Sequence, residues 1–145
     1  MEENYVFLND IEFTKEQVVR FVSSKTVIYS MNFKVHRYLE NLSINHKIAE
    51  DVLDENDLNL IFDKTVSMYG WYKHSDVFQK MQFEGVNILG MMDDTEFHTF
   101  MIMKLYEIRI LQKILNDKSP KKIIANKQFI KLIQKIIPGK TEFIE

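Results

Sequence analysis

Residues 26–50 read TVIYSMNFKVHRYLENLSINHKIAE, and this segment combines two kinds of hydrophobic pattern. Thr26–Tyr29 is β-branched and aromatic and is bounded by serines, which is typical of a buried strand. Apolar residues then recur at helical spacing from Val35 to Leu42, and His46–Glu50 is predicted to form a short second strand. A strand, a helix and a strand in this order predict a βαβ unit and therefore a parallel sheet.

The carboxyl-terminal part of the chain predicts a second unit of the same kind. Lys121–Ala125 is predicted to be a strand, Asn126 caps an amphipathic helix, and Pro138–Gly139 ends that helix. Thr141–Ile144 then begins another strand. We expect the strand before Asn126 to lie beside Thr26–Tyr29 in one sheet, with both strands pointing in the same direction.

Three more helices are indicated by their starting residues. Thr14 and Gln17 form a capping box before a short helix, whereas residues 1–13 show apolar runs without a clear period. Asp54 is a good N-cap for a helix over 55–73, whose apolar stripe comprises Leu58, Ile61, Phe62, Thr65, Tyr69 and Tyr72. A long helix over 94–117 starts with acidic residues, which suit the positive end of its dipole.

Together these elements predict an α/β fold. We expect a small, parallel, Rossmann-like sheet of three or four strands with flanking helices, and a helical insertion formed by the 55–73 and 94–117 helices. A length of 145 residues favours a single domain.

Composition narrows the possible chemistry and location. The chain has no cysteine, which excludes disulfides, thiolate metal sites and a cysteine nucleophile. Its acidic start is unlike a signal peptide, and no apolar run reaches the roughly 20 residues of a membrane span. We therefore expect a cytoplasmic protein with no membrane span.

The charge is distributed unevenly along the chain. Residues 1–103 hold 9 Lys and Arg against 17 Asp and Glu, whereas residues 104–140 hold 10 against 2. A basic segment can bind an anionic partner, or its lysines can simply form the solvated faces of two helices. Arg109 is its only arginine, and aromatic residues are not interleaved with the lysines. We therefore expect no nucleic-acid partner.

Motifs for self-contained catalysis are absent from the sequence. There is no glycine-rich dinucleotide motif, no Walker phosphate loop and no nucleophile elbow. No two histidines have the helical spacing of a metal site, and each is expected to be isolated: His36, His46, His74 and His98. The carboxylate clusters near Asp54 and Asp94 lie where helices begin, so capping explains them. The sequence assigns no catalytic residue, and we predict no cofactor and no metal.

Parallel sheets bind ligands beyond the carboxyl ends of their strands, near helix amino termini. Here those ends are residues 30–32 and 125–127, so the candidate ligand-binding residues are Ser30, Asn32, Asn126 and Lys127. Helix N–H groups and the Lys127 ammonium could contact a phosphate or a carboxylate. The alternative is a plain N-cap followed by a surface lysine.

A family resemblance appears in residues 71–125. Trp71-Tyr72 is followed by the segment FEGVNILG at 83–90, and then by a long amphipathic helix that ends in ILNDKSPKKII at 114–124. This pattern resembles the amino-terminal region of prokaryotic, especially archaeal, surface-polysaccharide enzymes. Those are two-domain, glycosyltransferase-like proteins related to the CDP-glycerol glycerophosphotransferase and nucleotide-sugar epimerase groups. The segment 26–48 also looks like the strand, helix and strand that open such proteins.

The resemblance implies that the chain is the amino-terminal part of a larger two-domain protein. In that family the nucleotide-sugar donor binds mainly in the carboxyl-terminal domain, which would be the missing partner here. The chain would then be the acceptor-side or scaffold half of a glycosyl- or polyol-phosphate transferase, inactive alone. It would hold a sugar or anionic acceptor near Asn32 and Asn126. The resemblance carries over no catalytic residue, because a turn before Gly85 explains Glu84 equally well.

A second hypothesis belongs to another class of protein. The chain could be a non-enzymatic interaction domain that docks a protein partner through exposed aromatic residues and its basic helices.

Overall fold

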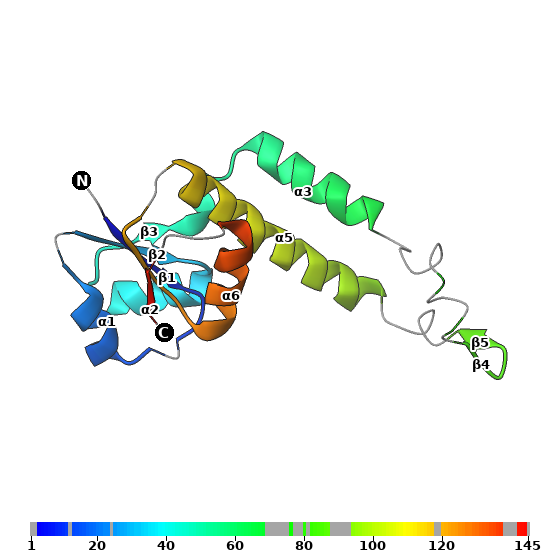
Figure 1. The fold of residues 1–145 in the computed structure, drawn as a ribbon, viewed down its shortest axis with the longest axis horizontal. Coiled ribbons are helices and arrows are strands. Elements are labelled where there is room, and N and C mark those ends of the chain that lie inside the picture. Colours follow the sequence, from blue (N-terminus) through cyan, green and yellow to red (C-terminus); the bar gives the residue numbers. More distant parts are fainter. Residues whose placement is uncertain are drawn as a thin grey trace. The chain divides into compact units, whose positions relative to one another are not determined.

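The computed structural model describes residues 3–11, 13–23, 25–68, 76, 80, 82–87, 94–117, 120–137 and 142–144 (Figure 1). The chain divides into two compact units. The first comprises Met1–Leu53 and Ile108–Glu145, and the second comprises Asp54–Glu107.

A parallel sheet forms the centre of the first unit. Its five strands have the order β3-β2-β1-β6-β7, and every pair of neighbours is parallel. The strands are β1 (Asn4–Leu8), β2 (Thr26–Ser30), β3 (Lys47–Ile48), β6 (Lys122–Ile124) and β7 (Glu142–Ile144). The predicted α/β class and the parallel, Rossmann-like sheet are confirmed, with one strand more than the three or four expected.

The additional strand is β1, which lies in the middle of the sheet. It pairs with β2 from Asn4 to Leu8 and with β6 on its other side. Strands β2 and β6 therefore share one sheet and one direction, as predicted, but the prediction that they are neighbours is wrong. From Tyr5 to Leu8 the side chains of β1 are buried on both faces, so this part of its sequence is continuously apolar and lacks the alternation of a half-buried strand.

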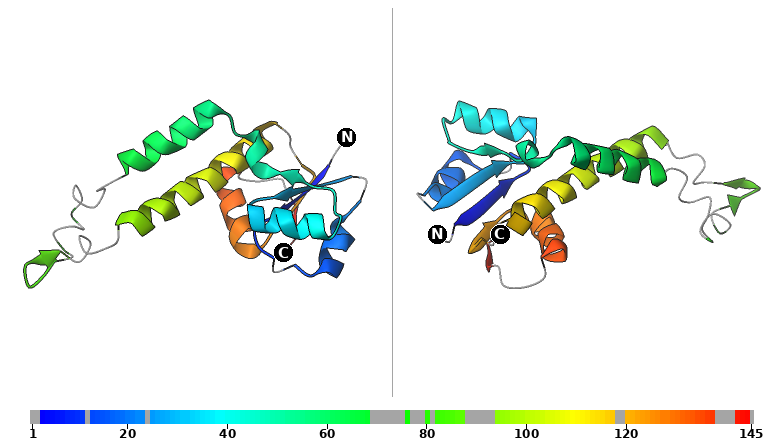
Figure 2. Two further views of the ribbon diagram at one scale, coloured as in Figure 1. Left: turned by 180° about the vertical axis from the view of Figure 1, so that it is seen from behind. Right: turned by 90° about the horizontal axis from the view of Figure 1, so that it is seen from above.

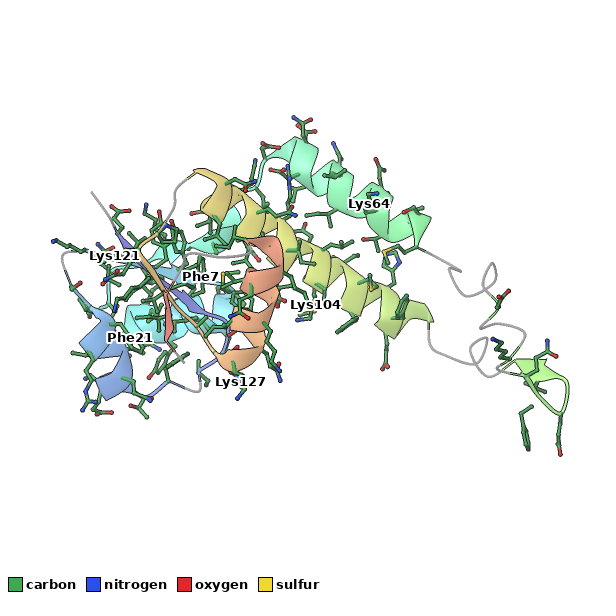
Figure 3. All side chains as sticks on the ribbon, in the orientation of Figure 1. Phe7, Phe21, Lys64, Lys104, Lys121 and Lys127 are labelled. Carbon is green, nitrogen blue, oxygen red and sulfur yellow. The ribbon has the colours of Figure 1, made fainter. Side chains whose placement is uncertain are left out.

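Helices cover both faces of this sheet (Figure 2). One face carries α1 (Lys15–Phe21) and α2 (Phe33–Asn41), and the other carries α6 (Lys127–Ile136) and residues 108–117 of α5 (Asp94–Asp117). Alternate residues of β1 enter the two layers: Val6 and Leu8 join one apolar cluster, and Tyr5 and Phe7 join the other. Phe7, labelled in Figure 3, is fully buried.

Most helix starts agree with the sequence. Capping boxes are present at Thr14 and at Asp54, and α5 has the predicted bounds. The predicted 46–50 strand is shorter than expected, because only Lys47–Ile48 pairs with β2 and a 3-10 helix, η1 (Ala49–Val52), follows at once. No described helix is long and apolar enough to cross a membrane.

The second unit, which is inserted between Leu53 and Ile108, contains α3 (Glu55–Ser67), the first part of α5 and a hairpin. The hairpin joins β4 (Gln82–Phe83) to β5 (Val86–Asn87) through Glu84 and Gly85, both of which have positive φ. Two consecutive residues of this kind form the turn that a two-residue hairpin favours. Glu84 therefore has a structural role.

The apolar stripe predicted for α3 is partly wrong. Ile61 and Thr65 are buried, together with Asp57, in a strip of residues spaced by four. Leu58 and Phe62 lie one position further round the helix from this strip, and they are 41% and 61% exposed. Tyr69 and Tyr72, the Trp71 segment and Pro138–Gly139 lie outside the described residues.

Candidate functional site

Three asparagines form a connected row where the central strands end. Asn9 follows β1, Asn32 follows β2 and Asn126 follows β6. The Asn32 Nδ2 donates to the Asn9 main-chain oxygen at 2.8 Å, and the Asn126 Nδ2 donates to the Asn9 Oδ1 at 2.8 Å. The structure thus connects two of the predicted site residues, Asn32 and Asn126, through Asn9, which was not predicted. Sequence analysis missed Asn9 because it missed β1.

Asn32 and Asn126 also cap the helices that follow them. The Asn32 Oδ1 accepts a hydrogen bond from the Val35 main-chain N–H at 3.0 Å, at the start of α2. The Asn126 Oδ1 accepts one from the Phe129 main-chain N–H at 2.9 Å, at the start of α6. These contacts confirm the predicted cap at Asn126 and show a second cap at Asn32. Lys127 is exposed at the start of α6 (Figure 3).

Ser30 and Asn32 line a cavity of about 330 Å³ at the carboxyl end of β2. Ser30 is buried, and its hydroxyl donates to the Lys47 main-chain oxygen at 3.3 Å, across the β2–β3 pair. Asn126 and Lys127 line neither this cavity nor the larger one beside it. The four predicted residues therefore separate into a pair at a cavity and a pair at the start of α6.

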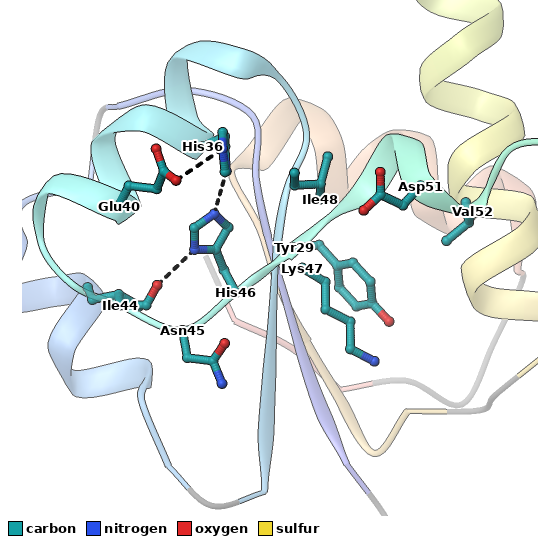
Figure 4. A pocket seen from close by; sticks show the side chains of 10 residues that line it. All are labelled: Tyr29, His36, Glu40, Ile44, Asn45, His46, Lys47, Ile48, Asp51 and Val52. Carbon is teal, nitrogen blue, oxygen red and sulfur yellow. Dashed lines mark hydrogen bonds and ion pairs between the residues drawn. The ribbon is translucent and has the colours of Figure 1, made fainter.

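A second cavity, of about 590 Å³, extends along β3 (Figure 4). Its polar lining comes from β2, α2, β3, η1 and the segment before β3: Tyr29, His36, Glu40, Asn45, His46, Lys47 and Asp51. His36, Ile48 and Asp51 border both cavities, so the two adjoin. Both volumes lie in the range of small-molecule sites, roughly 300–1,000 Å³.

His36 and His46 are hydrogen-bonded to each other at the wall of the larger cavity (Figure 4). The His36 Nδ1 and the His46 Nε2 are 2.8 Å apart, and the His46 Nδ1 is 2.8 Å from the Ile44 main-chain oxygen. The His36 Nε2 is 3.5 Å from the Glu40 Oε1. The expectation that these histidines are isolated is wrong, because the connection between α2 and β3 brings residues ten positions apart into contact.

The partners at the two ends of this chain decide where its protons lie. A carbonyl only accepts, so the His46 Nδ1 carries a proton and donates it to Ile44. In a neutral His46 the Nε2 then accepts from the His36 Nδ1, and the His36 Nε2 faces the Glu40 carboxylate without a proton. The two rings and the Ile44 main-chain oxygen therefore form one hydrogen-bonded chain, whose other end lies beside Glu40.

This assignment predicts a coupling that NMR can measure. In the ¹⁵N-labelled protein, a scalar coupling across the hydrogen bond is expected between the His36 Nδ1 and the His46 Nε2. The variant His46→Gln should abolish it and leave the ¹⁵N signals of His98, on α5, unchanged. Absence of the coupling in the parent protein, together with an unprotonated His46 Nδ1, would show that the assignment is wrong.

Tyr29 borders the larger cavity as a neutral phenol. Burial raises its pKa, and the negative charge of Glu3 acts in the same direction. Burial, followed by the charge on Tyr29, raises the pKa of Tyr5 to about 12. Neither phenol is therefore suited to accept a proton from a ligand near neutral pH.

Comparison with known proteins adds no relative. No family model, no curated protein and no solved structure matches the chain. Within the described part of the chain, no group of three or more His, Asp or Glu side chains is placed to hold a metal ion. The class of protein is therefore defined by the fold alone. The chain is a Rossmann-like α/β protein with two adjoining cavities at β2 and β3.

Proposed function

We propose that the chain is the acceptor-side half of a glycosyltransferase-like enzyme, and that the cavities at β2 and β3 bind a hydroxyl-rich acceptor. The observation that carries this proposal is the position of the smaller cavity. It lies at the carboxyl end of a parallel strand and is lined by Ser30 and Asn32. Parallel sheets of this kind bind their ligands at that edge.

The connection that follows β1 supports an acceptor rather than a nucleotide donor. Dinucleotide-binding folds place a glycine-rich turn there, so that the main chain can approach the pyrophosphate. In this chain residues 9–14 read NDIEFT and contain no glycine. Asn9 is instead hydrogen-bonded to Asn32 and Asn126. The resemblance in residues 71–125 points to the same half of the enzyme.

NMR titration of the ¹⁵N-labelled chain tests this proposal. N-acetylglucosamine, its 6-phosphate and sn-glycerol 3-phosphate represent acceptors, and CMP represents the nucleotide part of a donor. At least one acceptor is expected to shift the amide signals of Ser30, Ile48 and Asp51 in a saturable manner, whereas CMP is expected to leave them unchanged.

A matched pair of variants locates the binding. Ile48 borders both cavities, so Ile48→Arg is expected to fill them and weaken acceptor binding at least tenfold, or about 1.4 kcal/mol. Val22→Arg makes a similar change at an exposed residue after α1 and should leave affinity unaltered. Binding of CMP at these cavities, or no binding of any acceptor, would contradict the proposal.

A protein-interaction domain remains the second candidate, and one observation favours it. Helix α3 exposes four large apolar side chains: Leu58, Leu60, Phe62 and Val66. Leu58, Phe62 and Val66 are spaced by four and share one face of the helix. Exposed apolar patches of this kind mark docking surfaces in many proteins. The same titration separates the two candidates, because a pure interaction domain has no saturable acceptor binding at β2 and β3.

A further inference from the structure

The charged groups around the two cavities are mostly acidic. Glu40 on α2 lines the larger cavity, Glu50 on η1 lines the smaller one, and Asp51 borders both. Lys47 on β3 is the one ammonium group among the lining residues of these cavities. Tyr29, on β2, contributes a neutral phenol. The Glu40 carboxylate is paired with the Arg37 guanidinium on the same helix at 3.3 Å. An anion that enters therefore meets three carboxylates, one of them paired, and one lysine.

Two side chains at the smaller cavity that could offset this repulsion each donate one hydrogen bond within the protein. The Ser30 hydroxyl donates to the Lys47 main-chain oxygen, and the Asn32 amide donates to the Asn9 main-chain oxygen. A phosphate in the smaller cavity could receive a hydrogen bond from Ser30 only if the hydroxyl gave up its contact with Lys47, whereas the Asn32 amide has a second N–H beside the one that Asn9 accepts.

The two histidines at the larger cavity are engaged in the same way. Both ring nitrogens of His46 are bonded, one to Ile44 and one to His36, whose other nitrogen faces Glu40. The Lys47 ammonium and the Asn45 amide also line this cavity. A phosphate could accept hydrogen bonds from these two side chains without breaking the histidine contacts. Of the two, only Lys47 is positively charged.

Resting on the proposed function, we infer that the acceptor held at β2 and β3 is an uncharged sugar or polyol and not a phosphorylated one. A hydroxyl group both donates and accepts, so it can donate to Asp51 or Glu50 and accept from Lys47. A phosphate dianion offers only acceptors, and its charge opposes those of Glu50 and Asp51 and, more weakly, that of Glu40, which Arg37 partly offsets. The acidic, acceptor-rich lining thus favours a ligand that brings its own donors.

The test compares ligands that differ in one group. N-acetylglucosamine and N-acetylglucosamine 6-phosphate are titrated into the ¹⁵N-labelled chain at pH 7.5 and low ionic strength, and the amide signals of Lys47, Ile48 and Asp51 are followed. The phosphorylated sugar is expected to bind roughly tenfold more weakly or worse, because like charges repel across the cavity. The difference should shrink as salt is added.

Variants at exposed residues assign the effect to the cavity. Asp51→Asn removes one carboxylate from both cavities and is expected to reduce the difference between the two sugars severalfold. Asp63→Asn makes the same change on α3 and should keep the full difference. Glucosamine 6-phosphate carries a positively charged amine in place of the acetamide and keeps the phosphate. It therefore separates a requirement for a ligand without net negative charge from a general exclusion of phosphate.

The outcomes distinguish this inference from the function on which it rests. If the phosphorylated sugar binds at the same residues as tightly as the uncharged one, the inference is wrong and the acceptor-side function stands. If neither these sugars nor sn-glycerol 3-phosphate binds there, both fail. Weaker binding of the phosphorylated sugar that persists unchanged in Asp51→Asn and at high salt also overturns the inference, because repulsion would not be its cause.

Discussion

Replacing Phe7 by alanine is expected to lower the free energy of unfolding by about 4 kcal/mol, the usual loss for a buried phenylalanine. Phe7 lies on the central strand β1 and is fully buried. Its ring stacks on Tyr29, with centroids 5.3 Å apart and planes inclined by 17°, and it lies 6.3 Å from the ring of Phe129 on α6. The substitution therefore opens a cavity between the sheet and the helical layer. Urea denaturation followed by circular dichroism measures the loss.

A matched change on the surface serves as the control. Phe62, on α3, is 61% exposed, and Phe62→Ala is expected to change stability by less than about 0.5 kcal/mol. If Phe7→Ala does not fold, which a domain of ordinary stability of about 5–15 kcal/mol makes a real outcome, Phe7→Leu retains most of the volume and should cost about 1–2 kcal/mol. Equal effects at Phe7 and Phe62 would contradict the central position of β1.

Raising the pH from 9 to 12 is expected to destabilise the protein through Tyr5. Its pKa is about 12 in the folded protein and about 10 in the unfolded chain. As the pH rises, the unfolded state therefore loses the proton first. The contribution of Tyr5 to the free energy of unfolding is complete below pH 10 and is lost as the pH rises through 12. The difference of about two between the folded and unfolded pKa values corresponds to about 3 kcal/mol. The raised pKa of Tyr29 acts in the same direction.

Urea midpoints at pH 9, 10, 11 and 12, with tyrosinate absorbance at each pH, measure this effect. Tyr5→Phe removes the ionisable hydroxyl and should give a shallower loss of stability between pH 10 and 12. Tyr106→Phe, on α5, retains Tyr5 and should keep the steep loss. Parallel curves for the parent and Tyr5→Phe would show that burial of the Tyr5 hydroxyl does not drive the pH dependence.

Local patterns predicted the helices and strands of this fold better than their arrangement. The capping residues Thr14, Asp54 and Asn126 act within four positions of their partners, so sequence alone places the helix starts. The apolar segment Tyr5–Leu8 gave no period because both of its faces are covered. Its central position depends on pairing with residues more than a hundred positions away, which no local pattern contains.

The candidate site was predictable to the same extent. Asn32 and Asn126 follow strands that the sequence predicts, so their position at the edge of the sheet was foreseen. The link through Asn9 required knowing that β1 lies between those strands. The contact between His36 and His46 depends on the path of the chain from α2 to β3, and spacing rules for a single helix cannot reveal it.

The position of β1 also has a consequence for synthesis of the protein. Asn4 pairs with Thr26 after 22 positions but with Lys122 only after 118. A growing chain can therefore form the β1–β2 pair early, whereas the other edge of β1 stays open until the segment of β6 has left the ribosome. Closing so long a loop is slow and costs chain entropy. An open, apolar strand edge is also prone to pair with other chains. Nascent chains of this protein thus have a built-in interval in which a chaperone that covers β1 would reduce aggregation.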